Sequence, residues 1–242
     1  MPWGYSRKRR GGTTWNINLL NGLVAHWKLD EASGDALDAH GANTLTDVGG
    51  VGTGAGVVGT ARVTTGSKYF WSADNVALSM GDIDFTIAAW AFPTNHAALN
   101  DIVSKYGEAS GLREYQLTIT TGQARMGAAS AGVTLNQVRT LANSIQNNVW
   151  YFIVAGYNAT LDQLFISLNL ESAQTASHAG GAFDGAQRFA IGASFLADGT
   201  TPARNFVGSL DSISIWKRLL TPMEKHALYN GGNGLDYSGF TT

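Results

Sequence analysis

The sequence contains no cysteine and only four prolines, and charged residues make up just 14% of its 242 positions. The absence of cysteine excludes disulfide bonds, zinc thiolate sites and thiol catalysis. The longest apolar stretch, Trp150–Ala155, is far below the roughly 20 residues that a membrane-spanning helix needs. No long helical pattern precedes Pro222, which argues against α/β folds. We therefore expect a soluble protein built mainly from strands.

Glycine is plentiful, with 30 residues, and 44% of the chain is hydrophobic, which favours short buried strands joined by tight turns. A β-sandwich of this length is commonly a single domain. The glycine-rich segment Gly49–Gly59 lacks the Gly-Lys-Ser/Thr ending of a phosphate-binding loop, so we interpret it as a surface loop. The predicted strands are Leu23–Leu29, Ala61–Val63, Tyr69–Phe70, Phe85–Phe92, Ile102–Lys105, Tyr115–Thr120, Ala124–Ala129, Val138–Leu141, Trp150–Tyr157, Gln163–Asn169, Phe189–Gly192 and Phe206–Trp216.

The end of the chain predicts a strand followed by a short helix. Thr221 stands where an N-cap belongs, Pro222 at the first helical position and Glu224 three residues after the cap. The predicted helix, Met223–Tyr229, stops at Asn230-Gly231-Gly232, a typical C-terminal signal.

Four segments, in the same order, resemble strands of the laminin-G-like jelly rolls in the concanavalin A-like lectin/glucanase family. These segments are Gly22–Gly34, Asp84–Pro93, Asn148–Tyr157 and Phe206–Glu224. The resemblance implies an all-β fold over residues 22–242: a two-sheet antiparallel jelly-roll sandwich with a short C-terminal helix and an extended N-terminal arm. It also places four tryptophans in the core, namely Trp27, Trp90, Trp150 and Trp216. The family includes lectins, hydrolases, adhesion modules and structural proteins, so the fold alone leaves the function open.

The chain lacks the Glu-x-Asp-x-x-Glu strand of laminarinase-type hydrolases on this fold, whose alternate carboxylates face one cleft. Asp82 and Asp84 have the period-two spacing, but they precede a strand, where short polar side chains serve the turn. Asp30 and Glu31 are adjacent and would point to opposite faces. We therefore expect no catalytic residues and no enzymatic activity.

The resemblance also implies a structural calcium site between the first and last strands, with Asp211 as ligand and Asp30 or Glu31 opposite. The alternative is that Asp211 accepts backbone N–H bonds or pairs with a basic side chain. A second possible oxygen cluster, which ordinary turn formation explains equally well, comprises Asp35, Asp38 and Asn43.

Tyr69, Phe70 and Trp71 are consecutive aromatic residues, which cannot all face the same side of a strand. At least one is expected at the surface or under a loop. We select Trp71, together with Tyr69, as the candidate contact for a sugar or a neighbouring protein.

Residues 1–21 are interpreted as a basic anchoring arm. The first twelve residues carry four basic side chains and no acidic one, which leaves 12 basic against 18 acidic residues, a net charge of about −6, for the remainder. Because that remainder is acidic, nucleic acid is a less favoured partner than a protein surface. No apolar segment of 7–15 residues follows the basic run, so we expect no signal peptide. The proposed anchoring residues are Trp3, Tyr5, Arg7, Lys8, Arg9 and Arg10.

These features favour a non-catalytic structural or adhesion protein displayed on a large assembly. A phage virion is the leading expectation, as a head decoration or tail component, tethered by residues 1–21. The expected partners are capsid or tail subunits, further copies of the chain, and host-surface glycans. The alternatives are a free carbohydrate-binding lectin and, less favoured, an unusual glycoside hydrolase with two carboxylates about 5–9 Å apart in a cleft.

Overall fold

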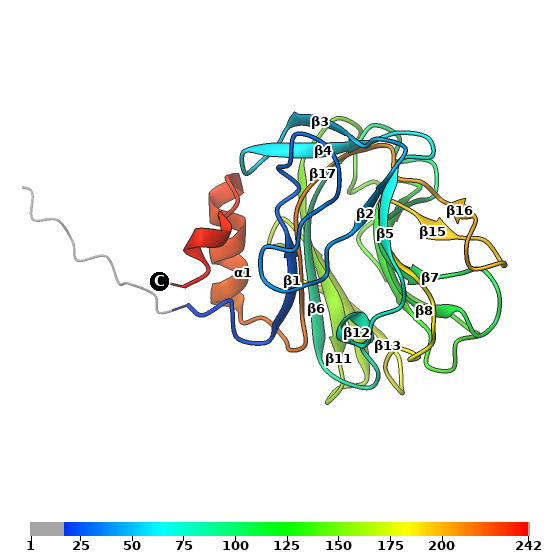
Figure 1. Ribbon diagram of the computed structural model, residues 1–242. Coiled ribbons are helices and arrows are strands. Elements are labelled where there is room, and N and C mark those ends of the chain that lie inside the picture. Colours follow the sequence, from blue (N-terminus) through cyan, green and yellow to red (C-terminus); the bar gives the residue numbers. More distant parts are fainter. Residues whose placement is uncertain (1–16, 242) are drawn as a thin grey trace, which may run out of the picture.

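The computed structural model describes residues 17–241, in which two antiparallel sheets stack face to face (Figure 1). Sheet I has the order β13-β12-β11-β6-β17-β4-β3, and β1 also pairs with β17. Sheet II has the order β10-β9-β8-β7-β14-β5-β2. Helix α1 and the C-terminal segment lie outside sheet I, and the β15–β16 hairpin lies on the side of sheet II. The all-β, two-sheet prediction is confirmed.

The strands of sheet I are β1 (Leu23–Trp27), β3 (Gly52–Ala55), β4 (Thr60–Thr64), β6 (Phe85–Pro93), β11 (Tyr151–Asn158), β12 (Gln163–Leu168), β13 (Gln174–Ser177) and β17 (Gly208–Trp216). Those of sheet II are β2 (Thr46–Val48), β5 (Tyr69–Ser72), β7 (Asn100–Tyr106), β8 (Arg113–Thr120), β9 (Gln123–Ala128), β10 (Asn136–Arg139) and β14 (Phe189–Ile191). The remaining elements are β15 (Ser194–Phe195), β16 (Pro202–Ala203), α1 (Pro222–Tyr229) and the short 3-10 turns η1 (Val76–Leu78), η2 (Asn230–Gly232) and η3 (Tyr237–Gly239).

The interpretation of Gly49–Gly59 as a loop is wrong in part, because it contains strand β3. Arg62 on β4 donates its side-chain N–H groups to the carbonyls of Val51 and Gly52, while Gly54 lies against Val63. The glycines leave room for these β4 side chains, so the strand forms without the alternation that normally reveals one.

The core lies between the sheets, and the strand sequences show which strands are covered on both sides. On β8 the pattern alternates: the inward side chains are Tyr115, Leu117 and Ile119, and the outward ones are Glu114, Gln116 and Thr118. Strand β6 is apolar throughout because its inward residues join the core while Ala88 and Trp90 pack outward under α1. Trp27, Trp90 and Trp216 are buried as predicted, and Trp150 is half-buried.

Helix α1 begins with the predicted capping box. The Glu224 N–H donates to Thr221 Oγ1 at 3.2 Å, and the Thr221 N–H donates to a Glu224 carboxylate oxygen at 2.8 Å. The helix ends at Asn230, whose φ of 47° is left-handed. Two terminal donors and the end of the helix are thus satisfied locally, as the sequence predicted.

The outer face of sheet I is covered by a second apolar cluster that unites α1 with both ends of the described chain. It includes Trp90, Trp216, Leu228 and Phe240. Leu19, which the sequence assigned to the arm, donates its N–H to the Phe240 carbonyl and accepts from Trp216 Nε1 at 2.7 Å. Residues 17–21 therefore pack on the sandwich. The proposed anchoring residues between Trp3 and Arg10 lie outside the described residues.

Candidate functional site

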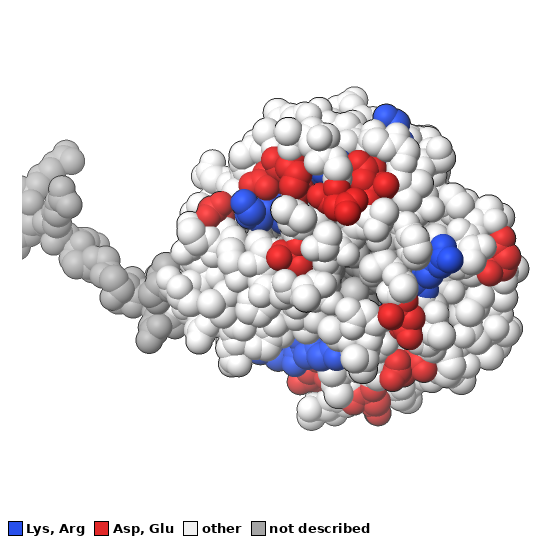
Figure 2. Space-filling model, viewed as in Figure 1, with Lys and Arg blue, Asp and Glu red and all other residues white. Residues whose placement is uncertain are grey.

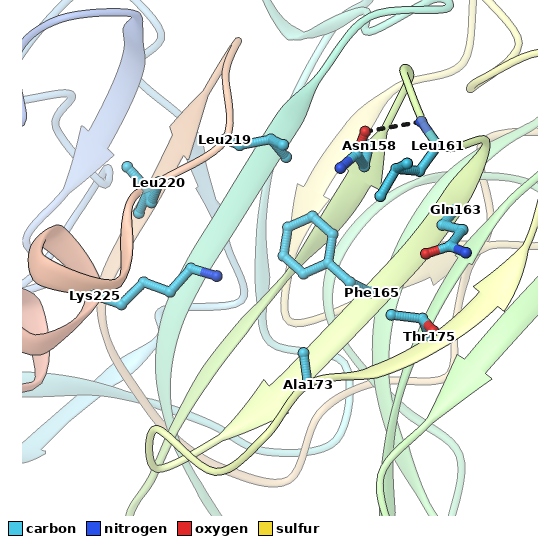
Figure 3. A pocket seen from close by; sticks show the side chains of 9 residues that line it. All are labelled: Asn158, Leu161, Gln163, Phe165, Ala173, Thr175, Leu219, Leu220 and Lys225. Atoms are coloured by element: carbon cyan, nitrogen blue, oxygen red, sulfur yellow. Dashed lines mark hydrogen bonds between the residues drawn. The ribbon is translucent and has the colours of Figure 1, made fainter.

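A groove runs between α1 and the β12–β13 edge of sheet I (Figure 3). It consists of two hollows of about 190 and 170 Å³, which share the lining residues Ala173 and Lys225. The first is lined by Asn158, Leu161, Gln163, Phe165, Ala173, Thr175, Leu219, Leu220 and Lys225. The second is lined by Ser167, Leu170, Glu171, Ala173, Pro222, Lys225 and His226.

The alternation of β12 supplies one wall of this groove. Gln163, Phe165 and Ser167 face outward, whereas Leu164 and Ile166 between them enter the core. Strand β13 is the edge strand of sheet I, so nothing in the sheet lies beyond it. The docking of α1 on the β6–β11 part of the face supplies the other wall.

Lys225 extends from α1 toward the ring of Phe165 in the middle of the groove (Figure 3). Its Nζ lies 5.2 Å from the ring centroid, a cation–π distance. Lys225 forms no ion pair within residues 17–241, and its partial burial lowers the pKa of the ammonium. The groove thus combines an aromatic ring, side-chain amides, a hydroxyl and a cation.

The predicted aromatic contact lies on the outer face of sheet II. Phe70 is in the core, while Tyr69 and Trp71 point outward. Tyr69 is covered by Phe195 in an edge-on contact, and Arg188 stacks on the half-buried Trp71 at 4.3 Å. The structure places both residues on one face, and their role as a contact for sugar or protein stays a prediction.

Sheet II also carries a buried polar network on this outer face, which the sequence reading missed. Lys105 on β7 is fully buried and binds Glu114 at 2.6 Å and Asp74 at 2.8 Å. Burial raises the pKa of Glu114 to about 7, although the Lys105 ammonium opposes that shift. Asp101, also fully buried, accepts a hydrogen bond from Thr118, and burial raises its pKa to about 6. The buried carboxylates of Glu114 and Asp101 are not accessible to a substrate.

Asp211, the predicted calcium ligand, lies on β17 beside the β3–β4 turn. Its Oδ2 accepts the N–H groups of Val57 and Val58 at 2.7 and 2.8 Å, which is the alternative considered from the sequence. Its Oδ1 is buried without a partner in the described chain, and burial raises the pKa of the carboxyl to about 6. A Cβ on Gly56 would lie 2.6 Å from Oδ2, so this turn requires glycine there.

The first strand does pair with the last, as the calcium prediction requires, but the other expected ligands have partners. Asp30 pairs with Lys28 at 2.8 Å, and Glu31 accepts the Leu37 N–H. Acidic atoms gather over the segment joining β1 to β2 (Figure 2), yet residues 17–241 contain no group of three or more His, Cys, Asp or Glu side chains arranged to hold a metal. Only the free Oδ1 of Asp211 fits a cation, so calcium binding remains a prediction.

The second oxygen cluster serves the turn in which it lies. Asp38 accepts N–H bonds from His26, His40 and Asn43; burial raises the pKa of its carboxyl, but these bonds outweigh that effect and lower it. Asp35 accepts the N–H of Asp47 on β2. Both carboxylates therefore have a structural use.

The period-two pair Asp82 and Asp84 has a structural role, as the sequence suggested. Asp82 accepts from the Tyr157 hydroxyl, and Asp84 accepts the N–H of Ala159 after β11. These bonds fix the entry of β6 against the β11–β12 turn. The groove has a single carboxylate among its described lining residues, Glu171, so it does not offer the pair that glycoside hydrolysis uses.

Comparison with known families gives one match. The model described as the concanavalin A-like lectin/glucanases superfamily, Laminin_G_3, matches residues 64–224. No curated protein sequence is detectably similar to the chain. Within the described residues, no helix has the length and apolar character needed to cross a membrane.

Solved structures with the same fold include several binding domains. The binding domain of Paraclostridial Mosquitocidal Protein 1 is 16% identical with a TM-score of 0.68, covering 89% of this chain and 53% of that one. The binding domain of Botulinum neurotoxin DC, in complex with SialylT, is 12% identical with a TM-score of 0.63, covering 88% and 52%. A Ruminococcus gnavus sialidase CBM40 bound to α2,3-sialyllactose is 18% identical with a TM-score of 0.50, covering 59% and 80%. The chain thus spans about half the length of the two toxin binding domains.

Proposed function

The chain belongs to the concanavalin A-like lectin/glucanases superfamily, and from that premise we propose that it is a non-catalytic module that binds carbohydrate in the groove beside α1. The lining chemistry of the groove carries the proposal. Sugars present apolar C–H faces and a rim of hydroxyl groups, so their sites combine an apolar or aromatic surface with a few fixed polar groups. Leu161, Leu219 and the edge of the largely buried Phe165 ring supply the first, and Gln163, Thr175 and Asn158 supply the second.

The comparisons support binding rather than catalysis. The toxin domains and the CBM40 are named as binding domains or as bound to a sugar, at identities that establish the fold alone. The single carboxylate in the groove and the inaccessible carboxylates of sheet II point in the same direction.

Binding to an immobilised glycan array followed by titration calorimetry tests the groove. We expect Gln163→Ala and Lys225→Met to weaken binding of the best array glycan about tenfold each, as loss of a hydrogen bond or charged contact predicts. Gln174→Ala is the matched control, because it removes the same amide from neighbouring strand β13 outside the groove. Unchanged affinity in both groove variants would reject this site, and an array with no bound glycan would reject the function.

The second part of the proposal concerns display: the module is carried on a large assembly, with a phage virion as the leading case, through its basic N-terminal segment. It is supported by the sequence alone, which concentrates four basic side chains in the first twelve residues of an otherwise acidic chain. Opposite charge favours docking of such a segment on an acidic protein surface.

Deleting residues 1–12 separates display from glycan binding. We expect the truncated chain to keep its melting temperature and its glycan affinity but to lose incorporation into particles, measured by co-sedimentation. Normal incorporation of the truncated chain would overturn the anchoring role. Comparing the light-scattering mass of the truncated and full chains tests whether the segment also drives self-association. For a lectin that acts free in solution, the truncation would change neither particle incorporation nor mass beyond the deleted residues.

A further inference from the structure

Two arginines lie directly opposite each other on the outer face of sheet II. Arg125 on β9 pairs in register with Arg139 on edge strand β10. Their neighbours Ala124, Met126 and Val138 enter the core, so both guanidinium groups stand on the outer side. Continuing across the sheet, Arg125 is opposite Thr118 on β8.

Neither arginine has an acidic partner within residues 17–241. Arg125 donates one N–H to the Thr121 hydroxyl at 2.9 Å, but its Nε is buried and has no hydrogen-bond partner. Arg139 is exposed and donates to Gln137 at 3.3 Å. The acid in the same row, Asp101, lies beyond Thr118 and is occupied by its hydroxyl.

This arrangement is unfavourable in the free protein. Like charges directly opposite each other on neighbouring strands repel, and a buried donor without an acceptor loses its bond to water. Burial, and then the charge of Arg139, lower the pKa of the Arg125 guanidinium, which reports the same strain electrostatically. An anion bound between the two groups would remove the repulsion and, by drawing the Arg125 guanidinium outward, would give its Nε an acceptor.

We propose that Arg125 and Arg139 form a subsite for the acidic group of a glycan, a carboxylate or a sulfate ester. The inference rests on the proposed function, since it names the class of glycan that the module prefers. Two guanidinium groups match the planar oxygens of a carboxylate or the oxygens of a sulfate with paired N–H donors. Gln137 and Thr121, which are neutral, border the pair and suit the hydroxyl groups of a sugar rather than a second charge.

The subsite and the groove lie around the same edge of the sandwich. Strands β10 and β13, the edge strands of sheets II and I, contact each other, and Asn136 on β10 meets His178 just after β13 at 3.1 Å. A glycan chain with an acidic residue could contact both regions by passing this edge.

Titration calorimetry with 3′-sialyllactose, lactose 3′-sulfate and neutral lactose tests the proposal. The first probe carries a carboxylate and the second a sulfate ester without a carboxylate, so the two distinguish these groups. We expect the full chain to bind at least one acidic probe more tightly than lactose, with affinity falling as salt increases. Arg125→Gln and Arg139→Gln should each weaken that binding about tenfold or more. Lys28→Gln, which also removes one positive charge but lies directly after β1, should leave it unchanged.

Side-chain NMR and melting temperature make the outcome unambiguous. The Nε–H signals of the two arginines should shift with the acidic probe and not with lactose. Arg139→Gln should melt at the same or a higher temperature, because it removes repulsion; a marked decrease would assign Arg139 a structural role instead. If glycans bind in the groove but neither arginine signal nor either variant responds, the subsite is rejected while the proposed function stands. If no glycan binds and only inorganic sulfate shifts the signals, both proposals fail and the pair is a general anion site.

Discussion

The outer faces of the two sheets are both largely covered, but by opposite means. On sheet I the cover is apolar: Trp90 packs between Phe152 and Tyr229 of α1, and Trp216 stacks near Phe240. On sheet II the buried outward side chains of β7 and β8 are mainly polar and charged, with the Lys105–Glu114 pair fully buried, and only a small apolar cluster around Tyr69 and Phe195 adjoins them in the described chain.

The difference shows what each kind of cover requires. Apolar burial stabilises in proportion to area and tolerates many geometries. A buried charge is tolerated only with a partner at hydrogen-bond distance, so the sheet II face depends on particular contacts. The same face also has polar atoms without a partner in the described chain, such as Nε of Arg125.

The largest expected effect tests the apolar face. Trp90→Ala should lower the free energy of unfolding by about 3–5 kcal/mol, because it leaves a cavity between sheet I and α1. The matched control on sheet II is Trp71→Ala, where the half-buried ring stacks on Arg188 and packs against a small apolar cluster; we expect about 1 kcal/mol there. Urea unfolding measures both. Equal losses would contradict the view that sheet I relies on apolar cover more than sheet II does.

The next effect tests the polar face. Glu114→Leu should destabilise by about 3 kcal/mol, since it leaves the buried Lys105 with the half-exposed Asp74 alone. Adding Lys105→Met to that variant should recover most of the loss, because it removes the buried charge that Glu114→Leu left without its partner. A double variant as unstable as the single one would show that the pair contributes through packing, not charge. Denaturant unfolding of the two variants and the wild type gives the comparison.

The smallest effect compares how the faces respond to acid. His26, stacked on Tyr237 under the sheet I cover, has its pKa lowered to about 4 by burial. Because its folded pKa lies below the unfolded value near 6.5, its contribution is complete above pH 6.5 and is lost as the pH falls toward 4, by about 2–3 kcal/mol. On sheet II, burial raises the pKa of Asp101 to about 6, so the effect of acid on stability has the opposite sign there. The unfavourable buried charge of Asp101 is neutralised as the pH falls from 6 to 4, which stabilises the folded state.

Chemical unfolding at pH 7, 5.5 and 4.5 measures this difference. His26→Gln should reduce the stability lost between pH 7 and pH 4.5. Asp101→Asn should increase that loss, because it removes a group whose protonation stabilises the folded state in acid. Parallel pH profiles for both variants and the wild type would exclude these two groups as the source of the pH dependence.

Local signals were sufficient for part of the fold. The Thr221–Glu224 box and the Asn230 stop depend on neighbouring residues alone, and they define α1 correctly. The alternation of β8 likewise identified a strand. The sequence could not show that its outward residues, such as Glu114, would be buried, because their cover comes from the distant segment around Gln187.

The sites depend on long-range geometry and were mostly missed. Arg125 and Arg139 become a pair only through the register of β9 on β10, which the 13 residues between them do not specify. The groove exists because α1 docks beside β12, and nothing in either segment alone indicates that approach. Asp211 was identified as notable, but its role in holding the β3–β4 turn required knowing that Gly56 lies against it.

The hydrogen bond between Leu19 and Phe240 has a practical consequence for handling this protein. It brings both ends of the described chain to the side of the sandwich that carries α1, away from sheet II (Figure 1). A carrier or solid support attached beside Ile17 or Thr241 will stand on the α1 side of the sandwich, whereas the arginine pair lies on the other sheet. Samples immobilised at these positions keep the acidic-sugar subsite away from the support, and measurement in free solution then shows whether the support affects binding in the groove.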